Sequence, residues 1–290
     1  MKTNWIWILT FVGPALILLM VFLIIPIFAS FYLSFTDFNV FAMTDWSRAK
    51  LVGLRNFIEL FKDELFWKAL MNTFYCLVVA MPVTVVLSLT CAVLLNREQT
   101  RFKSFFRTSF FLPFITNTVA IAVVWSWILN PSYGLLNWFL SLFGIKGPNW
   151  LGDPRWAMPS VIMLVVWKAV GYNAILFLAG LQNMPDFLYE AAELDGATSW
   201  QKFWYITLPM LRPTMVFVTT MMIIGYLQLF EEPYMLTQGG PLNSTLSIVL
   251  YLYRQGFKFF KLGYASSIAV VLFLMISALT LLRLKLAERE

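Results

Sequence analysis

Six long apolar stretches, separated by segments that hold most of the charged residues, dominate the pattern of this 290-residue chain. A helix that crosses the hydrocarbon core of a bilayer needs about 20 residues with few charges. The pattern therefore predicts an all-α integral membrane protein, one domain over residues 1–290, with spans at 5–36, 69–95, 105–129, 157–180, 211–230 and 262–284. Residues 3–36 carry no charge over about twice the length of the apolar part of a secretory signal, so we expect this first stretch to be retained.

The composition agrees with a protein that lives in lipid. Hydrophobic residues make up 60% of the chain and charged residues 12%, against about 25% charged residues in an ordinary soluble protein. A water-soluble globule of this size has too little interior to hide so much apolar surface. The composition excludes a soluble enzyme and a disordered chain.

The chain has no histidine and two cysteines. The absence of histidine excludes a Ser-His-Asp triad, a Cys-His pair and a zinc site with a histidine ligand. Cys76 and Cys91 are too far apart along a helix for a disulfide, so we expect two thiols. We expect no metal and no catalytic residue.

The basic residues bear on orientation, because short cytoplasmic loops are enriched in lysine and arginine. An even number of spans places both termini on one side. With the N-terminus inside, lysines and arginines are equally numerous on the two sides but denser inside, where Arg97, Arg101, Lys103 and Arg107 cluster. The pattern favours cytoplasmic termini.

The segment between the fourth and fifth spans, residues 181–212, is not an ordinary loop. Pro185 suits the first turn of a helix, Asn183 or Asp186 suits its cap, and Gly196 suits the residue that ends it. On that helix the carboxylates form one arc, which consists of Asp186, Glu190 and Glu193. The pattern predicts a short helix with an acidic face.

A second short helix follows the glycine. Thr198 or Ser199 can cap it, Pro209 ends it, and Pro213 begins the fifth span. It carries the aromatic residues Trp200, Phe203 and Trp204. Such a hairpin could lie on the lipid surface, but an anionic inner leaflet would repel its acidic face, so a protein partner with basic groups fits better.

Three groups of residues in this segment carry a resemblance: Glu190, Ala191 and Ala192; Asp195, Gly196 and Ala197; and Phe203 with Pro209. Their order and spacing resemble the EAA signature of binding-protein-dependent ABC importer permeases. Residues 53–57, 66–73, 237–245 and 263–265 are also similar to the first of two paired permeases of the maltose, glycerol-phosphate and oligosaccharide group. The sequence lacks the extra N-terminal spans and outer domain of the larger maltose permease, so that system's substrate contacts are not carried over.

The resemblance implies a type I ABC importer permease fold in the bacterial inner (cytoplasmic) membrane, with residues 181–212 containing a cytoplasmic coupling helix. It implies four partners: a second EAA-type permease subunit in a heterodimer, a cytoplasmic ATPase dimer, an extracytoplasmic solute-binding protein and a carbohydrate substrate. ATP and Mg²⁺ would be held by the ATPase, and this chain would bind no cofactor and no nucleic acid. The chain itself contains no G-x-x-x-x-G-K-[ST] phosphate loop, so we expect it not to be an enzyme.

Polar residues within the spans are candidates for the substrate pathway, because polar groups in hydrocarbon usually face a cavity or each other. On the fourth span they are Lys168, Tyr172 and Asn173; on and after the fifth they are Tyr226, Gln228, Glu231 and Glu232. Two alternatives stay open: the tyrosines belong to an interfacial aromatic belt, or Lys168 forms a buried pair with a neighbour.

The outer loop with Thr237, Gly239, Gly240 and Pro241 is a candidate contact for the binding protein, although a plain tight turn explains its glycines equally well. An ion-coupled secondary transporter is the alternative function. It would need carboxylates within the spans as relays, and no Asp or Glu lies well inside any predicted span.

Overall fold

The computed structural model describes residues 5–45, 49–96 and 102–289. Arg97 and Arg101, which were used to predict the orientation, lie outside the described residues. The chain divides into two compact units, and each is described by itself. The first unit comprises Met1–Trp67 and Tyr251–Met275, and the second comprises Lys68–Leu250 and Ile276–Glu290.

The first unit contains the N-terminal helix and the segments that follow it. Its elements are α1 (Trp5–Leu19), the π-helical turn η1 (Met20–Ile24), α2 (Ile25–Ser34), α3 (Val40–Thr44), α4 (Arg55–Lys62) and η4 (Arg254–Lys258). Three helices have residues in both units: α5 (Glu64–Asn96), α15 (Ile248–Tyr253) and α16 (Leu262–Arg289).

The second unit holds the remaining helices. They are α6 (Lys103–Ile115), α7 (Thr118–Ile128), α8 (Leu135–Ser141), α9 (Pro154–Gln182), α10 (Phe187–Leu194), α11 (Ser199–Lys202), η3 (Phe203–Thr207), α12 (Leu208–Met210), α13 (Arg212–Leu227) and α14 (Glu231–Thr237). In this unit α9 packs against α6, α13 and α14. Its Leu164 and Phe177 are fully buried, so α9 forms the core of the unit.

Four helices within the described residues are long and apolar enough to cross a membrane: Thr10–Ser34, Glu64–Asn96, Pro154–Gln182 and Leu262–Ala287. Two bent helix pairs pass the same test as pairs, which gives up to six spans. The predicted number of spans is therefore reached only if each bent pair is one span.

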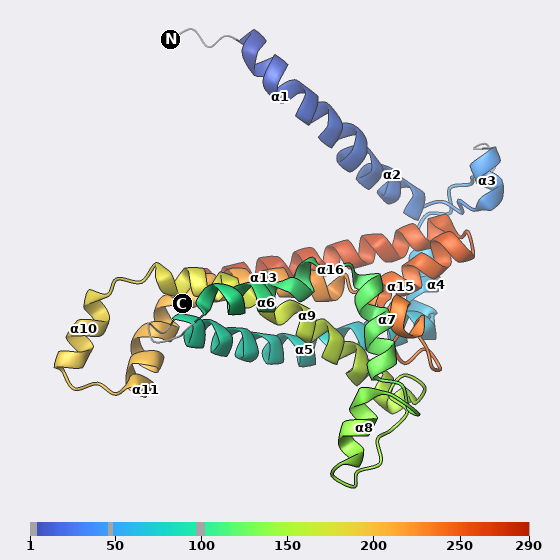
Figure 1. The fold of residues 1–290 in the computed structure, drawn as a ribbon. Helices are drawn as coiled ribbons and strands as arrows, with labels where there is room; N and C mark the ends of the chain where they lie inside the picture. Colours follow the sequence, from blue (N-terminus) through green and yellow to red (C-terminus); the bar gives the residue numbers. More distant parts are fainter. Residues whose placement is uncertain (1–4, 46–48, 97–101, 290) are drawn as a thin grey trace. The chain divides into compact units, whose positions relative to one another are not determined.

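The predicted third span, 105–129, is not one straight helix. Its halves α6 and α7 meet at an angle of 98°, and the bend is visible in Figure 1. Thr116 has an extended backbone, and the Asn117 side chain accepts a hydrogen bond from the N–H of Val119 at 2.8 Å. Because the Asn117 side chain caps the residues after it, a separate helix starts there, which explains the break within an uninterrupted apolar stretch.

A second bend lies at the start of the predicted fifth span, 211–230. The segment Ser199–Met210 meets α13 at 66°, so the hairpin residues and the span form two separate helical segments. Pro213 lies in the first turn of α13, as predicted, because a proline there loses no helical hydrogen bond.

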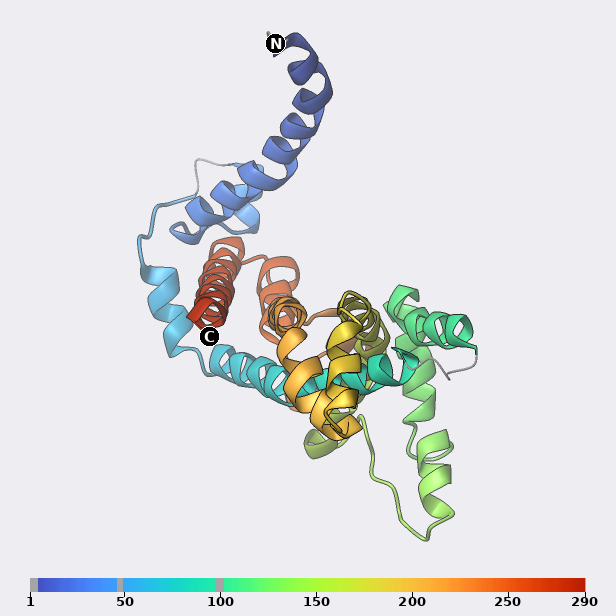
Figure 2. The ribbon, with the colours of Figure 1, turned by 90° about the vertical axis from the view of Figure 1, so that its left-hand side faces the viewer.

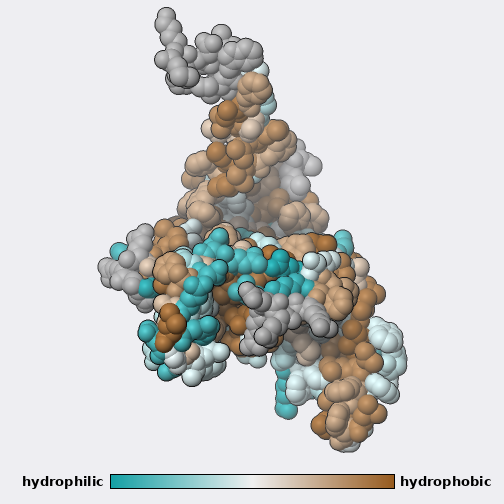
Figure 3. Space-filling view, turned by 60° about the vertical axis from the view of Figure 1, so that its left-hand side comes forward, coloured by the Kyte–Doolittle hydropathy of each residue, from teal (hydrophilic) through white to brown (hydrophobic). Residues whose placement is uncertain are grey.

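Many large apolar side chains lie on the surface rather than inside. Phe11, Phe22 and Phe28 of the first unit are 76%, 74% and 70% exposed. Figure 3 shows hydrophobic side chains over much of the visible surface. Such a surface is unfavourable in water and is expected of helices in contact with lipid.

Candidate functional site

The segment between α9 and α13 forms the predicted helix–glycine–helix hairpin, in which α10 and α11 lie next to each other (Figures 1 and 2). Gly196 has a φ of +77° and follows the end of α10. Its N–H bonds to the Glu193 carbonyl at 3.0 Å, and the Ala197 N–H bonds to the Ala192 carbonyl at 2.9 Å. This is the Schellman arrangement, so the prediction that Gly196 ends the helix is confirmed.

The start of α10 differs from the prediction. Asp186 occupies the cap position, but its side chain accepts no capping hydrogen bond. Its backbone is helical (φ −64°, ψ −31°), whereas a capping side chain normally requires an extended backbone. Asn183 also does not cap, because its Nδ2 donates to the Ala179 carbonyl at 3.0 Å. Pro185 precedes the helix instead of lying in its first turn.

The second half of the hairpin begins as predicted. The Thr198 hydroxyl accepts the N–H of Gln201 at 3.3 Å, and the Gln201 side chain accepts the N–H of Thr198 at 2.8 Å. This reciprocal capping box satisfies two backbone donors that the helix leaves free. Thr198, and not Ser199, is therefore the cap.

The prediction that Pro209 ends the second helix of the hairpin is wrong. Pro209 lies in the first turn of α12 and does not end the helical segment, which breaks instead at Leu211. The preceding residues form the wider π-helical turn η3, in which the Leu208 N–H bonds to the Phe203 carbonyl.

Side-chain bonds hold the two halves of the hairpin together. Lys202 Nζ lies 2.6 Å from Glu193 Oε1, and the Tyr189 hydroxyl lies 2.9 Å from Thr207 Oγ1. Glu193 is thus neutralised from within the hairpin. Of the predicted acidic arc, Asp186 and Glu190 are exposed and form no ion pair among the described residues.

The hairpin also presents apolar surface. Leu194 is 91% exposed, Tyr205 80% and Trp200 69%. A groove of about 1030 Å³ runs between the C-terminal part of α5 and the hairpin, with Leu94, Trp200 and Trp204 among its lining residues. Of the remaining predicted coupling residues, Ala191, Asp195 and Pro209 are exposed and Ala192, Ala197 and Phe203 are half-buried. The hairpin therefore combines free carboxylates with uncovered aromatic and aliphatic side chains.

The predicted pathway residues fall into one cluster and several separate contacts. Lys168 Nζ lies 3.0 Å from Glu232 Oε1, 3.9 Å from Glu231 Oε2 and 2.6 Å from Thr118 Oγ1. The cluster joins α9, α14 and α7. Lys168 thus has the ion-pair partner that the alternative interpretation anticipated.

The other pathway residues make their own contacts. The Tyr172 ring stacks on Phe114 with a centroid distance of 4.3 Å, and the buried Tyr226 hydroxyl lies 2.9 Å from Thr84 Oγ1. Asn173 is buried and donates to the Ala169 carbonyl of its own helix at 2.8 Å. Gln228 is exposed at the end of α13.

The loop after α14 is held firmly by α5. Gln238 and Gly239 have left-handed backbones, the Gly240–Pro241 peptide bond is cis, and the Thr237 hydroxyl lies 2.6 Å from Thr245 Oγ1. Lys68 Nζ donates to the Leu242 carbonyl at 2.6 Å, and Asn72 Nδ2 donates to the Asn243 carbonyl at 2.9 Å. The predicted Gly-Gly-Pro turn is therefore a tightly bonded loop.

Sequence reasoning missed the partners of these residues. They are Thr84, Phe114 and Thr118 in the pathway and Lys68 beside the outer loop. Each lies on a different helix or loop from its partner. The only signal was their polar or aromatic character within or next to an apolar stretch, which does not identify a partner.

Comparison with known proteins identifies the class. Residues 66–289 match the family described as "Binding-protein-dependent transport system inner membrane component". The chain is 38% identical over 285 residues to the lactose transport system permease protein LacF of Rhizobium radiobacter, with 97% of this chain and 93% of LacF covered. It is 35% identical over 282 residues to the arabinooligosaccharides transport system permease protein AraP of Bacillus subtilis, with 96% and 87% covered.

A solved structure agrees with these relatives. A chain of a bacterial alginate ABC transporter, in complex with an alginate pentasaccharide-bound periplasmic protein, superposes with a TM-score of 0.83 and 25% identity. The match covers 99% of this chain and 95% of that chain. The chain belongs to the family of inner-membrane components of binding-protein-dependent transport systems. The predicted family, the all-helical importer permease fold and the prediction that the chain is not an enzyme are confirmed.

Proposed function

We propose that this chain is the membrane-spanning subunit of an ATP-driven importer that carries a sugar or oligosaccharide delivered by an extracytoplasmic binding protein. Membership of the binding-protein-dependent family supports the mode of delivery. The relatives named for lactose and arabinooligosaccharides, and the match to an alginate importer, support a carbohydrate as substrate.

The exposure of the hairpin is the observation that supports its role in coupling the ATPase to the membrane helices. We infer that α10 and α11 dock on a cytoplasmic ATPase dimer, which holds ATP and Mg²⁺, with Glu190 paired to a basic group and Leu194 and Trp200 in apolar contact. The bonds Lys202–Glu193 and Tyr189–Thr207 make the hairpin stiff. A stiff hairpin between α9 and α13 would transmit closure of the ATPase to both helices.

This assignment fixes the proposed orientation. The hairpin and both termini face the cytoplasm, and the loop at Thr237, Gly239, Gly240 and Pro241 faces the binding protein. The bonds from Lys68 and Asn72 favour a preformed contact surface there, which loses little conformational entropy on binding. The other half of the pore would come from a second EAA-type permease subunit.

For the pathway we propose the polar residues of α9, α13 and α14. Tyr172 is half-buried, with its ring held by Phe114, and suits stacking on the C–H face of a sugar. Glu231 has 62% of its side chain exposed and Gln228 is exposed, so both could bond sugar hydroxyls. Lys168, Asn173, Tyr226 and Glu232 already have internal partners and would shape the wall.

The test uses the chain assembled with its second permease and ATPase in proteoliposomes, with the binding protein and sugar supplied outside. Glu190→Lys should abolish most of the sugar-stimulated ATPase activity and uptake, with Glu190→Gln intermediate. Glu64→Lys, the same charge reversal at an exposed residue outside the hairpin, is the matched control.

Wild-type coupling in Glu190→Lys would contradict the coupling assignment. Uptake by the chain without any ATPase would instead support the ion-coupled secondary transporter. Alanine at Tyr172 or Gln228 with unchanged uptake would remove that residue from the pathway.

A further inference from the structure

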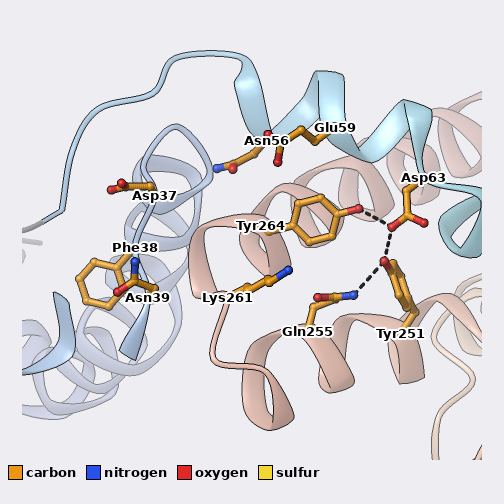
Figure 4. A pocket seen from close by; sticks show the side chains of 10 residues that line it. All are labelled: Asp37, Phe38, Asn39, Asn56, Glu59, Asp63, Tyr251, Gln255, Lys261 and Tyr264. Atoms are coloured by element: carbon orange, nitrogen blue, oxygen red, sulfur yellow. Dashed lines mark hydrogen bonds between the residues drawn. The ribbon is translucent and has the colours of Figure 1, made fainter. Parts of the chain in front are cut away.

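The first unit contains a polar cavity of about 410 Å³ that shares no residue with the predicted pathway or coupling hairpin. Figure 4 shows that Asn56, Glu59 and Asp63 approach it from α4 and the residue after it, and that Tyr251, Gln255, Lys261 and Tyr264 approach it from the α15–α16 side. A cavity of this volume is at the small end of ligand sites in proteins.

One side of the cavity is held rigidly by Asp63. Its carboxylate accepts hydrogen bonds from the hydroxyls of Tyr251 and Tyr264, and from the Leu65 N–H at 2.9 Å. Burial raises the pKa of Asp63, but these hydrogen bonds outweigh it and the pKa is lowered. Asp63 is therefore an ionised and satisfied structural group that fixes two tyrosines in the wall.

Other groups around the cavity keep unused hydrogen-bonding capacity. Asn56 is only 7% exposed, and its Nδ2 donates to the carbonyls of Ser34 and Thr36 at 2.8 Å each. Both amide hydrogens are used, while the Asn56 Oδ1 accepts no bond within the described part of the chain. This oxygen is not among the buried side-chain atoms without a partner, and Asn56 lines the cavity, so its Oδ1 is an accessible acceptor for a donor there.

Gln255 and Lys261 complete the unused set. Gln255 Nε2 donates to the Tyr251 hydroxyl at 2.8 Å, which leaves its Oε1 as an acceptor. Lys261 is exposed, and its ammonium forms no ion pair with the described residues. Figure 4 shows both side chains extending into the same space.

The cavity is lined by three carboxylates and one lysine. Glu59 pairs with Arg55 at 2.8 Å and Asp63 is bonded by two tyrosine hydroxyls, which leaves Asp37 and Lys261 as the two opposite charges not taken up by such contacts. Lys261 would repel a cation, and the carboxylates would repel an anion. Among the described residues, no group of three or more His, Cys, Asp or Glu could hold a metal ion.

What remains is a ligand without net charge that can both donate to amide and carboxylate oxygens and accept from an ammonium. Hydroxyl groups do both. We propose that this cavity binds one or two neutral sugar residues, as a carbohydrate site separate from the membrane pathway. The inference rests on the proposed function for the nature of the substrate.

The experiment measures sugar binding to the complete importer in lipid nanodiscs without the binding protein, by saturation-transfer difference NMR. The probes are maltose, lactose and raffinose, and glucose is compared with glucosamine and glucuronate. Two variants each neutralise one charged group that lines the cavity. Lys261→Met removes the ammonium, and Asp37→Asn removes a charge but keeps an acceptor for the Lys50 N–H, which bonds Asp37 at 2.7 Å. Lys146→Met, at another exposed lysine, is the control.

We expect at least one neutral oligosaccharide to bind and each variant to weaken it about fivefold, the loss expected for one hydrogen bond of about 1 kcal/mol. Lys146→Met should change nothing. The inference is overturned if no neutral sugar binds, if either cavity variant leaves the affinity unchanged, or if glucosamine or glucuronate binds more tightly than glucose.

Uptake with the binding protein separates this inference from the proposed function. If wild-type importer transports a sugar but the cavity variants bind it normally, only the cavity site is wrong. If no sugar is transported by the assembled wild-type importer, the proposed substrate class itself is wrong.

Discussion

Lys168 and Glu232 form an ion pair, with Nζ and Oε1 3.0 Å apart, between helices α9 and α14. The two side chains are only 18% and 12% exposed. Removal of one partner from such a pair leaves the other charge without compensation in a poorly solvated place. We therefore expect Lys168→Met to lower the free energy of unfolding by about 2–4 kcal/mol.

The double variant Lys168→Met/Glu232→Gln should recover much of that loss, because no uncompensated charge remains. Thermal unfolding of wild type, both single variants and the double variant in nanodiscs measures the coupling. Additive losses in the double variant would show that the pair contributes nothing as a pair. Sugar uptake by the stable double variant then tests whether the pair also serves transport.

Gly171 on α9 lies where α6 passes closest. A Cβ atom added there would overlap the backbone carbonyl of Phe110, which cannot move without displacing α6. We expect Gly171→Ala to destabilise the protein by about 3 kcal/mol or more, at the upper end of overpacking effects. Gly225→Ala is the matched control, because nothing lies within 4 Å of the added atom. Thermal unfolding in nanodiscs compares them, and equal stability of the two variants would contradict the close α6–α9 packing.

Asp63 and Tyr251 give the first unit a defined pH dependence. The lowered pKa of Asp63 means that its stabilisation is present above the ordinary aspartate pKa of about 3.9 and is lost as the pH falls through the folded value. Burial and the hydrogen bond to Asp63 raise the pKa of Tyr251 to about 12. Its stabilisation is therefore present below the ordinary tyrosine pKa of about 10 and is lost as the pH rises towards 12.

Thermal unfolding between pH 3 and pH 11 should show these two losses at the ends of a plateau. Asp63→Asn should remove much of the acid loss, and Tyr251→Phe should remove much of the alkaline one. An acid loss that is the same in Asp63→Asn would assign it to other carboxylates.

The long apolar helices and the hairpin could be predicted because their signals are local. Uncharged stretches of about 20 residues mark helices in lipid, and Gly196 and Thr198 occupy positions that need a left-handed backbone and a capping hydroxyl. The bend at Asn117 could not be predicted in this way, because the apolar stretch continues through it and one asparagine within such a stretch does not by itself indicate a helix cap.

The contacts between helices could not be predicted from the sequence, for another reason. The pairing of Lys168 with Glu232 and of Tyr226 with Thr84 depends on how α9, α14, α13 and α5 pack, which no spacing along the chain encodes. Of the three carboxylates of the predicted acidic arc, Glu190 and Glu193 lie on α10 and Asp186 lies at its cap position. Its charge was overestimated, because Lys202 comes back across the turn to neutralise Glu193.

Substitutions at Gly196 test the hairpin through the backbone conformation at this position, without changing a side-chain contact. An added Cβ meets nothing within 4 Å, so a substitution there acts through the φ of +77° alone. We expect Gly196→Ala to cost about 1 kcal/mol in the hairpin and to lower the ratio of sugar-stimulated to basal ATPase activity. Gly196→Asn should lose less, because asparagine adopts the left-handed conformation more readily than alanine. If Ala and Asn reduce coupling equally, or neither does, the turn geometry is not what transmits the force.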